Sequence, residues 1–155
     1  MIEKTLCVSA ICHGTVIDHI KAGEALKIIR VLQLNADGNT VTVGLNLKSQ
    51  SLGIKDLIKV ENVFLSKSQA DHIAIFSPTA TINVIQNYKL TKKFGVEMPE
   101  IVDGILACPN PRCIANLEQI PTSFSIDGID EDLYLCCKYC EKMFTRDQIH
   151  ERIYF

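Results

Sequence analysis

Four cysteines stand in two close pairs near the C-terminal end of this 155-residue chain. Cys108 and Cys113 are separated by four residues in the stretch CPNPRC, and Cys137 and Cys140 are separated by two residues in CKYC. Zinc in proteins favours four tetrahedral Cys or His ligands, supplied as close pairs from two turns. The spacing therefore predicts one structural Zn2+ ion per chain, held by these four cysteines.

Two other interpretations of the cysteines stay open. Four buried free thiols need no metal, although two tight pairs seldom arise by chance, and an iron–sulfur cluster also takes four thiolates. Cys136 adjoins Cys137, but only Cys137 keeps the two-residue spacing to Cys140. We therefore expect Cys136 to be a packed or exposed thiol, and Cys7 and Cys12 to be core residues of a first strand.

We expect no chemistry at this metal. Four thiolates fill the coordination shell, whereas a catalytic zinc keeps one position open for water or substrate. The sequence contains no His-x-Glu before a Pro-Cys-x-x-Cys, which is the deaminase pattern, no His-Glu-x-x-His and no Gly-x-x-x-x-Gly-Lys phosphate loop. The motifs of deaminases, metalloproteases and P-loop ATPases are thus all missing.

The composition is that of an ordinary globular protein, with 47% apolar and 22% charged residues. No apolar run approaches the ~18 residues that a membrane helix needs. The first residues, MIEKTLCVSAICHG, lack the small-residue cleavage site of a secretory signal. We expect a cytoplasmic protein without a membrane partner, in which cysteines bind metal or stay reduced.

The charge is distributed unevenly along the chain. Residues 1–97 contain eleven Lys/Arg and eight Asp/Glu, whereas residues 98–155 contain five and ten. This asymmetry predicts two units, 1–97 and 98–155, with different partners. A four-cysteine ribbon that binds nucleic acid needs cations to neutralise phosphates, so the acidic second unit favours a protein partner. A zinc-ribbon nucleic-acid-binding protein remains the alternative.

The pattern of the first unit predicts an α+β domain of ferredoxin-like type. Strands are expected at 5–12, 41–47, 54–65 and 80–90, with 14–20 also extended, and helices at 22–34 and 66–75. The order strand, helix, strand, strand, helix, strand is typical of an antiparallel sheet covered by two helices on one face.

Three local signals support these elements. Ser66 is followed three residues later by Gln69, which is a capping-box pattern. Apolar residues at helical spacing predict the buried face of the first helix: Ala22, Ala25, Leu26, Ile29 and Leu32. Alternating residues predict one shared face of the strand 41–47: Val41, Val43, Leu45 and Leu47.

The second unit is predicted to be a small β domain. Residues 91–104 look like a linker, and short strands are expected at 123–126 and 133–136, on either side of the acidic turn 127–132. Two cysteine hairpins combined with short strands form a four-cysteine zinc ribbon.

Basic residues flank two of the predicted strands of the first unit: Lys55, Lys59, Lys89, Lys92 and Lys93. Cations for phosphates, combined with a carboxylate such as Asp18 for ribose hydroxyls, would suit a nucleotide. Scattered lysines more often form a solvated face, and a lone histidine such as His19 is more often structural. The pattern alone therefore leaves both interpretations open.

Several stretches together closely resemble the regulatory chain of aspartate carbamoyltransferase. They are GTVIDHI (14–20), VGLNL (43–47), KDLIKVEN (55–62) and the frame of four cysteines, and the likeness runs over nearly the whole chain. The resemblance implies a non-catalytic subunit with an N-terminal allosteric domain and a C-terminal zinc domain that docks on catalytic chains. It also implies a homodimer of regulatory chains, in a holoenzyme with six chains of each kind.

The resemblance further implies one nucleotide site for CTP, the inhibitor and end product of pyrimidine biosynthesis, and ATP, the activator. Asp18 and His19 would lie by the ribose and phosphates, Lys59 by the ribose and base, and Lys93 by the phosphates. The remaining expected residues would read the base or line the pocket: Ala10, Ile11, Tyr88, Val16, Asn83 and Ile85. Ser9 and Thr5 depart from the family pattern, which has an acidic residue and a lysine there.

Overall fold

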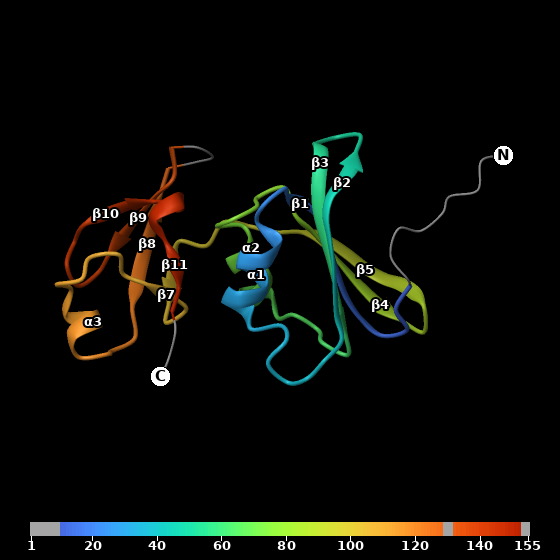
Figure 1. Ribbon diagram of the computed structural model, residues 1–155, viewed down its shortest axis with the longest axis horizontal. Coiled ribbons are helices and arrows are strands. Elements are labelled where there is room, and N and C mark those ends of the chain that lie inside the picture. Colours follow the sequence, from blue (N-terminus) through green and yellow to red (C-terminus); the bar gives the residue numbers. More distant parts are fainter. Residues whose placement is uncertain (1–9, 129–131, 153–155) are drawn as a thin grey trace.

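The computed structural model describes residues 10–128 and 132–152 of the chain. Two packed regions follow each other along the sequence (Figure 1). The first contains a five-stranded sheet with two helices, and the second contains a four-stranded and a two-stranded sheet. No helix in these described ranges is long and apolar enough to cross a membrane.

The five-stranded sheet is antiparallel throughout, with the strand order β2-β3-β1-β4-β5. Its elements are β1 (Gly14–Lys21), α1 (Ala25–Leu32), β2 (Val41–Ser49), β3 (Gly53–Glu61), α2 (Lys67–Ile73), β4 (Thr81–Gln86) and β5 (Lys89–Gly95). Ile17, Ile58 and Ile82 lie opposite one another on β1, β3 and β4 and are buried on one face. The ferredoxin-like arrangement is confirmed, with β5 as an additional edge strand.

The helices form where local signals predict them. The capping box at the start of α2 is present, because the Ser66 hydroxyl accepts from the Gln69 N–H at 3.2 Å and the Gln69 side chain accepts from the Ser66 N–H at 3.0 Å. The predicted buried face of α1 is shifted. Ala25, Ile28 and Val31 are buried, whereas Leu26 is 50% exposed. Apolar residues surround most of this helix, so spacing alone does not select the stripe that faces the sheet.

The strand predicted at 80–90 is too long, because β4 ends at Gln86 and the chain turns back at Asn87 and Tyr88. Both residues have left-handed backbones, with φ of 51° and 63°, as a tight two-residue hairpin requires. The following segment, expected to begin a linker, is β5 and pairs with β4. The turn lacks the usual Asn-Gly signal, which explains why the sequence pattern misses it.

The alternation predicted for 41–47 also fails in part. The pairing of β2 with β3 shifts register between Gly44 and Leu47, and Asn46 has φ of 57°. This bulge turns Leu45 outward, where it is 48% exposed, while Val41 and Val43 still pack on the core.

The first strand expected at 5–12 falls mostly outside the described residues, as do Cys7, Ser9 and Thr5. Residues 10–12 are not strand, and Cys12 is half-buried before β1 begins. Gly14 starts β1 with φ of 146°, and a side chain there would approach the Val60 carbonyl oxygen to 2.2 Å. Only glycine fits at this crossing of β1 and β3.

The second region consists of short strands around a small core. Its sheets are β10-β9-β8-β6 and β11-β7, and the predicted strands at 123–126 and 133–136 correspond to β8 and β9. Its elements are β6 (Ile101–Asp103), β7 (Leu106–Ala107), α3 (Ile114–Leu117), β8 (Ser123–Asp127), β9 (Tyr134–Cys137), β10 (Met143–Thr145), the 3-10 turn η2 (Arg146–Gln148) and β11 (His150–Glu151). Val102, Phe124, Leu135 and Phe144 fill the core. Part of the acidic turn, residues 129–131, lies outside the description.

An ion pair joins the two regions. The Arg30 Nε on α1 lies 2.9 Å from the Glu151 Oε1 on β11. Both side chains are partly open to solvent. The last helical turn of α1 thus faces the last strand of the chain.

The Asp56 carboxylate organises one end of the five-stranded sheet. It is fully buried and accepts hydrogen bonds from the backbone N–H groups of Gly23 at 2.9 Å, Ala25 at 3.3 Å and Asn46 at 3.0 Å. These contacts fix the start of α1 and the bulge of β2 to β3. They also satisfy the backbone N–H of Ala25, which is buried.

We predict that Asp56→Ala lowers the free energy of unfolding by about 3 kcal/mol, because three backbone N–H groups lose a charged acceptor and one of them, that of Ala25, is buried. Urea unfolding followed by circular dichroism measures the effect. Glu61→Ala, at the other end of the same strand, is the control and should change stability by less than about 0.5 kcal/mol. Equal effects of the two substitutions would contradict the role assigned to Asp56.

Candidate metal centre and nucleotide-binding face

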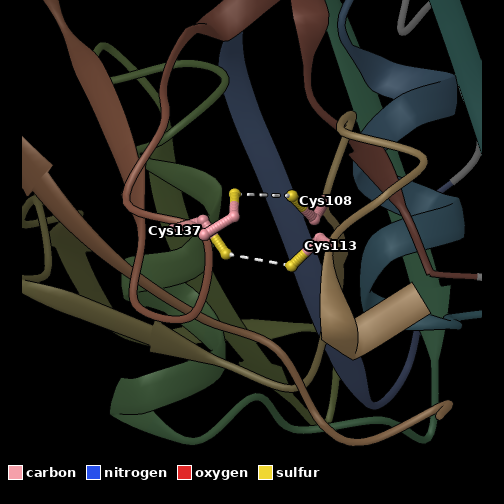
Figure 2. A group of neighbouring side chains, drawn as sticks. Cys108, Cys113 and Cys137 are labelled. Carbon is pink, nitrogen blue, oxygen red and sulfur yellow. Dashed lines mark hydrogen bonds between the residues drawn. The ribbon is translucent and has the colours of Figure 1, made fainter. Parts of the chain in front are cut away.

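The four cysteines predicted to hold a metal come together in the structure. Their Sγ atoms all lie within 4.8 Å of one another. Cys108 and Cys140 are 3.7 Å apart at sulfur, and so are Cys113 and Cys137. Figure 2 shows Cys108 and Cys113 approaching from one side of the cluster and Cys137 from the other. Because metal–sulfur bonds of ~2.3 Å at tetrahedral angles place sulfurs ~3.8 Å apart, the cluster has the size of a ZnS4 site.

Two tight turns deliver the sulfurs. Cys108 follows β7 and Cys113 precedes α3, and the Asn116 side chain braces the turn between them by donating to the carbonyls of Cys108 at 2.9 Å and Asn110 at 2.7 Å. On the other side, Cys137 ends β9. Its N–H donates to the Lys142 carbonyl at 3.0 Å. The turns are therefore shaped by hydrogen bonds around the sulfurs.

The pKa values of the cysteine thiols indicate whether the site can hold a metal cation. Burial raises the pKa of the Cys108 thiol well above its ordinary value, and it also raises the pKa of the Cys137 thiol. Burial also acts on Cys140, but N–H donors from Lys142 and Asn110 outweigh it and lower its pKa to about 7. A metal cation that binds all four as thiolates must release protons. The buried sulfurs fit such an ion, which would have no open position for a substrate.

Cys136 is not part of the cluster. It alternates with buried Leu135 and Cys137 along β9, so its side chain lies on the other face of the sheet. Its sulfur approaches the carbonyls of Cys137 and Glu141 at 3.9 Å and 3.7 Å. The expectation of a packed or exposed thiol agrees with this placement.

One row of the expected nucleotide residues crosses the five-stranded sheet. Lys59 lies opposite Val16, Val16 opposite Asn83, and Asn83 opposite Lys93. These positions alternate with the buried isoleucines, so their side chains lie on the face away from α1 and α2. Asp18 and Ile85 lie on the same face by the same alternation. We refer to these six residues as the open-face group.

Asp18 is held in place by Lys55, which belongs to the basic residues of the sequence pattern but not to the set implied by the family resemblance. Its Oδ1 accepts from the Lys55 Nζ at 2.8 Å and from the His19 N–H at 2.6 Å. Burial pushes the pKa of Asp18 upward, but these donors outweigh it and leave the pKa below the ordinary value. Lys55 and Lys59 are four residues apart on one strand and therefore share a face. That period-two spacing is the signal that identifies Lys55.

Lys59 and His19 complete this part of the face. Burial lowers the pKa of the Lys59 ammonium, although the charge of Asp18 acts against the shift. The His19 Nδ1 lies 2.9 Å from the Thr81 Oγ1, and the left-handed backbone of His19 marks a bulge in β1. Partly desolvated cations beside a carboxylate can bind polyanionic ligands that also carry hydroxyl groups.

The remaining expected residues lie at the β4–β5 turn. Tyr88 is 69% exposed, and its N–H donates to the Cys12 carbonyl at 3.0 Å. Ala10 is exposed and Ile11 is buried on the same stretch of chain. Lys92 lies on the opposite face from Lys93, with its ammonium 5.0 Å from the centre of the Phe94 ring.

The chain is similar in sequence to one family over nearly all of its length. Residues 6–97 match the family described as the allosteric domain of the aspartate carbamoyltransferase regulatory chain, and residues 100–150 match its metal-binding domain. A regulatory chain of this name from Chromobacterium violaceum is 48% identical over 149 residues, covering 96% of this chain and 98% of the relative. Those from Vibrio cholerae serotype O1 (strain M66-2) and Photobacterium profundum are 45% and 44% identical, and the alignments cover 96% and 97% of this chain and of each relative.

We predict that Cys137→Ser removes the bound metal and unfolds residues 101–151, because metal binding worth about 10–16 kcal/mol in small zinc peptides becomes folding free energy in such a unit. The five-stranded sheet should stay folded, since it has its own core. Elemental analysis gives the metal content, and amide hydrogen exchange resolves the two regions. Cys136→Ser is the matched control and should retain one metal ion per chain. Full protection of residues 101–151 in metal-free Cys137→Ser would refute the prediction.

Proposed function

Because the chain belongs to the family of aspartate carbamoyltransferase regulatory chains, we propose that it binds CTP and ATP on its five-stranded sheet and transmits their effects to catalytic chains in pyrimidine biosynthesis. The observation that carries the proposal is the open-face group, because these six residues come from three separate stretches of sequence and meet on one face. CTP acts as the inhibitor and ATP as the activator.

The face offers groups for each part of a nucleoside triphosphate. Lys93 on β5 supplies a cation for the phosphates, and Asp18 with Lys59 supplies hydrogen bonds for the ribose. The base lies toward the β4–β5 turn, where backbone groups of Ala10, Ile11 and Tyr88 recognise its edge. Val16, Asn83 and Ile85 form the floor, and the Asn83 side chain already donates to the Val16 carbonyl at 3.3 Å.

The metal is Zn2+ and its role is structural. Four thiolates are soft ligands that suit zinc in a closed tetrahedral shell. The chain therefore catalyses no carbamoyl transfer by itself. Family membership also disfavours the nucleic-acid-binding alternative, as does the acidic charge of residues 98–155.

The cysteine turns supply a docking surface for the catalytic chain. Ile114 and Leu117 on α3 are exposed beside the first cysteine pair, and Tyr139 is exposed within the second. Aromatic and aliphatic anchors of this kind dominate the energetics of protein interfaces. Since the turns depend on the metal, the metal shapes the surface that carries these side chains.

A second copy of the chain binds through the N-terminal region. β2 is an edge strand of the five-stranded sheet, and Leu45 on β2 and Leu26 on the neighbouring α1 are half exposed. An open strand edge beside apolar side chains favours pairing with a partner. Two such chains link catalytic trimers in a cytoplasmic holoenzyme with six chains of each kind.

The regulatory mechanism is linkage. Each nucleotide favours the quaternary state to which it binds more tightly, with a coupling free energy typically of ~1–3 kcal/mol. The Arg30–Glu151 pair is one of the contacts between the nucleotide-binding and metal-binding regions through which the effect passes.

We predict that Lys93→Ala weakens binding of CTP and ATP together, by roughly tenfold to a hundredfold, because both share a triphosphate and a charge-assisted contact contributes ~1.5–3 kcal/mol. Isothermal titration calorimetry measures both affinities. Lys92→Ala is the matched control, since it removes the adjacent ammonium on the opposite face and should leave the affinities unchanged. If calorimetry gives wild-type affinities for Lys93→Ala, Lys93 is not in the site.

We also predict that assembly with catalytic trimers requires the bound metal, and that this chain alone has no catalytic activity. The purified chain should show no carbamoyl transfer, and the metal-loaded chain should co-elute with catalytic trimer on size exclusion. Chain stripped of zinc by a mercurial should fail to co-elute, yet retain CTP binding. Normal assembly of the zinc-free chain would contradict the docking role, and turnover by the purified chain would contradict the non-catalytic role.

A further inference from the structure

An apolar cavity lies away from the open-face group. It has a volume of about 380 Å³ and contains none of the ten residues expected to bind a nucleotide. Its lining residues are Lys21, Ala22, Leu52, Ile54, Pro78, Thr79 and Arg146. Cavities above about 300 Å³ with apolar walls and a few polar groups are typical of sites for small organic ligands.

The walls of the cavity are mostly apolar and come from separate elements. Ala22 follows β1, Leu52 and Ile54 lie at the β2–β3 hairpin, and Pro78 follows α2. Leu52 and Ile54 are exposed to solvent at this point. An apolar ligand body would cover them and remove their surface from water.

The charged groups of the cavity are both cationic. Lys21 is contributed by β1 and Arg146 by η2, and no carboxylate lines the described cavity. Lys21 makes no ion pair with any residue within 10–128 or 132–152. Its backbone is fixed, because its N–H donates to the Ser77 Oγ at 2.9 Å. The Thr79 hydroxyl donates to the His19 carbonyl at 2.8 Å, which fixes the opposite rim.

We propose that this cavity binds a small organic anion with an apolar body, such as an aromatic carboxylate or sulfonate, at a site separate from the nucleotide site. The charge of the cavity selects an anion, and its walls select an apolar body over inorganic phosphate. Arg146 provides a planar fork of donors that suits a carboxylate or sulfonate. The volume limits the ligand to about the size of two fused rings with a substituent.

The position of the cavity gives such a ligand a regulatory effect. Lys21 belongs to the nucleotide-binding region and Arg146 to the metal-binding region, so a ligand that contacts both cations connects the two regions. It would shift any equilibrium between their arrangements by its difference in affinity for each. Ligand binding in this cavity does not require nucleotide binding on the open face.

The test uses the full metal-loaded chain and the fluorescent dye 1-anilinonaphthalene-8-sulfonate, an aromatic sulfonate of suitable size. One dye should bind per chain. Lys21→Gln and Arg146→Gln should each weaken it by roughly tenfold to a hundredfold, as expected for loss of one charge-assisted contact. N-phenyl-1-naphthylamine, which has the same rings without the sulfonate, should bind wild type more weakly. Arg112→Gln, a change at an exposed cation outside the cavity, is the control and should leave dye affinity unchanged.

Circular dichroism and metal content establish that each variant is folded before dye is added. Equal affinity for the charged and uncharged dyes, or unchanged affinity in both cavity variants, would overturn the proposal. Displacement of the dye by saturating CTP would also overturn it, because the dye would then occupy the nucleotide site. Stoichiometric dye binding by a chain that does not bind CTP would count against the proposed function and leave this site standing.

Discussion

Four sulfurs within 4.8 Å of one another cannot all be ionised without a cation between them. The fold of the second region depends on that constraint, because its strands have only two to five residues and its helix has four. Elements this short bury too little surface to hold a fold without a staple. The metal site therefore acts as the staple that holds β7, α3 and β9 around the small apolar core, and it positions the exposed side chains of the cysteine turns.

The first region follows a different principle. Its two helices cover one face of the five-stranded sheet, and the isoleucines of β1, β3 and β4 provide a core that needs no metal. Because side chains alternate along each strand, the opposite face is left for polar residues that need not hold the fold together. Buried core residues and residues open to other roles thus occupy alternate positions of the same strands, as Ile58 and Lys59 show on β3.

Features encoded by local spacing could be predicted from the sequence, including the four-cysteine cluster and the capping box at Ser66. Features that depend on distant contacts could not. The turn at Asn87 and Tyr88 and the outward rotation of Leu45 arise from sheet pairing, and the stripe of α1 that faces the sheet is selected by packing. The Asp18–Lys55 ion pair depends on the pairing of β1 with β3, which the sequence pattern does not specify. The nucleotide residues came from family resemblance, and the geometry brings six of them onto one face while their role stays a prediction.

The ion pair between Arg30 and Glu151 has a consequence for solution conditions. Its side chains are 55% and 20% exposed, and exposed pairs contribute only about 0–1 kcal/mol. At physiological ionic strength charges are screened over roughly 8 Å, and over roughly 3 Å at 1 M salt. Ionic strength should therefore tune how firmly the end of α1 is held against β11. The two regions of the chain should therefore be connected more rigidly in a buffer of low salt than in a buffer of high salt.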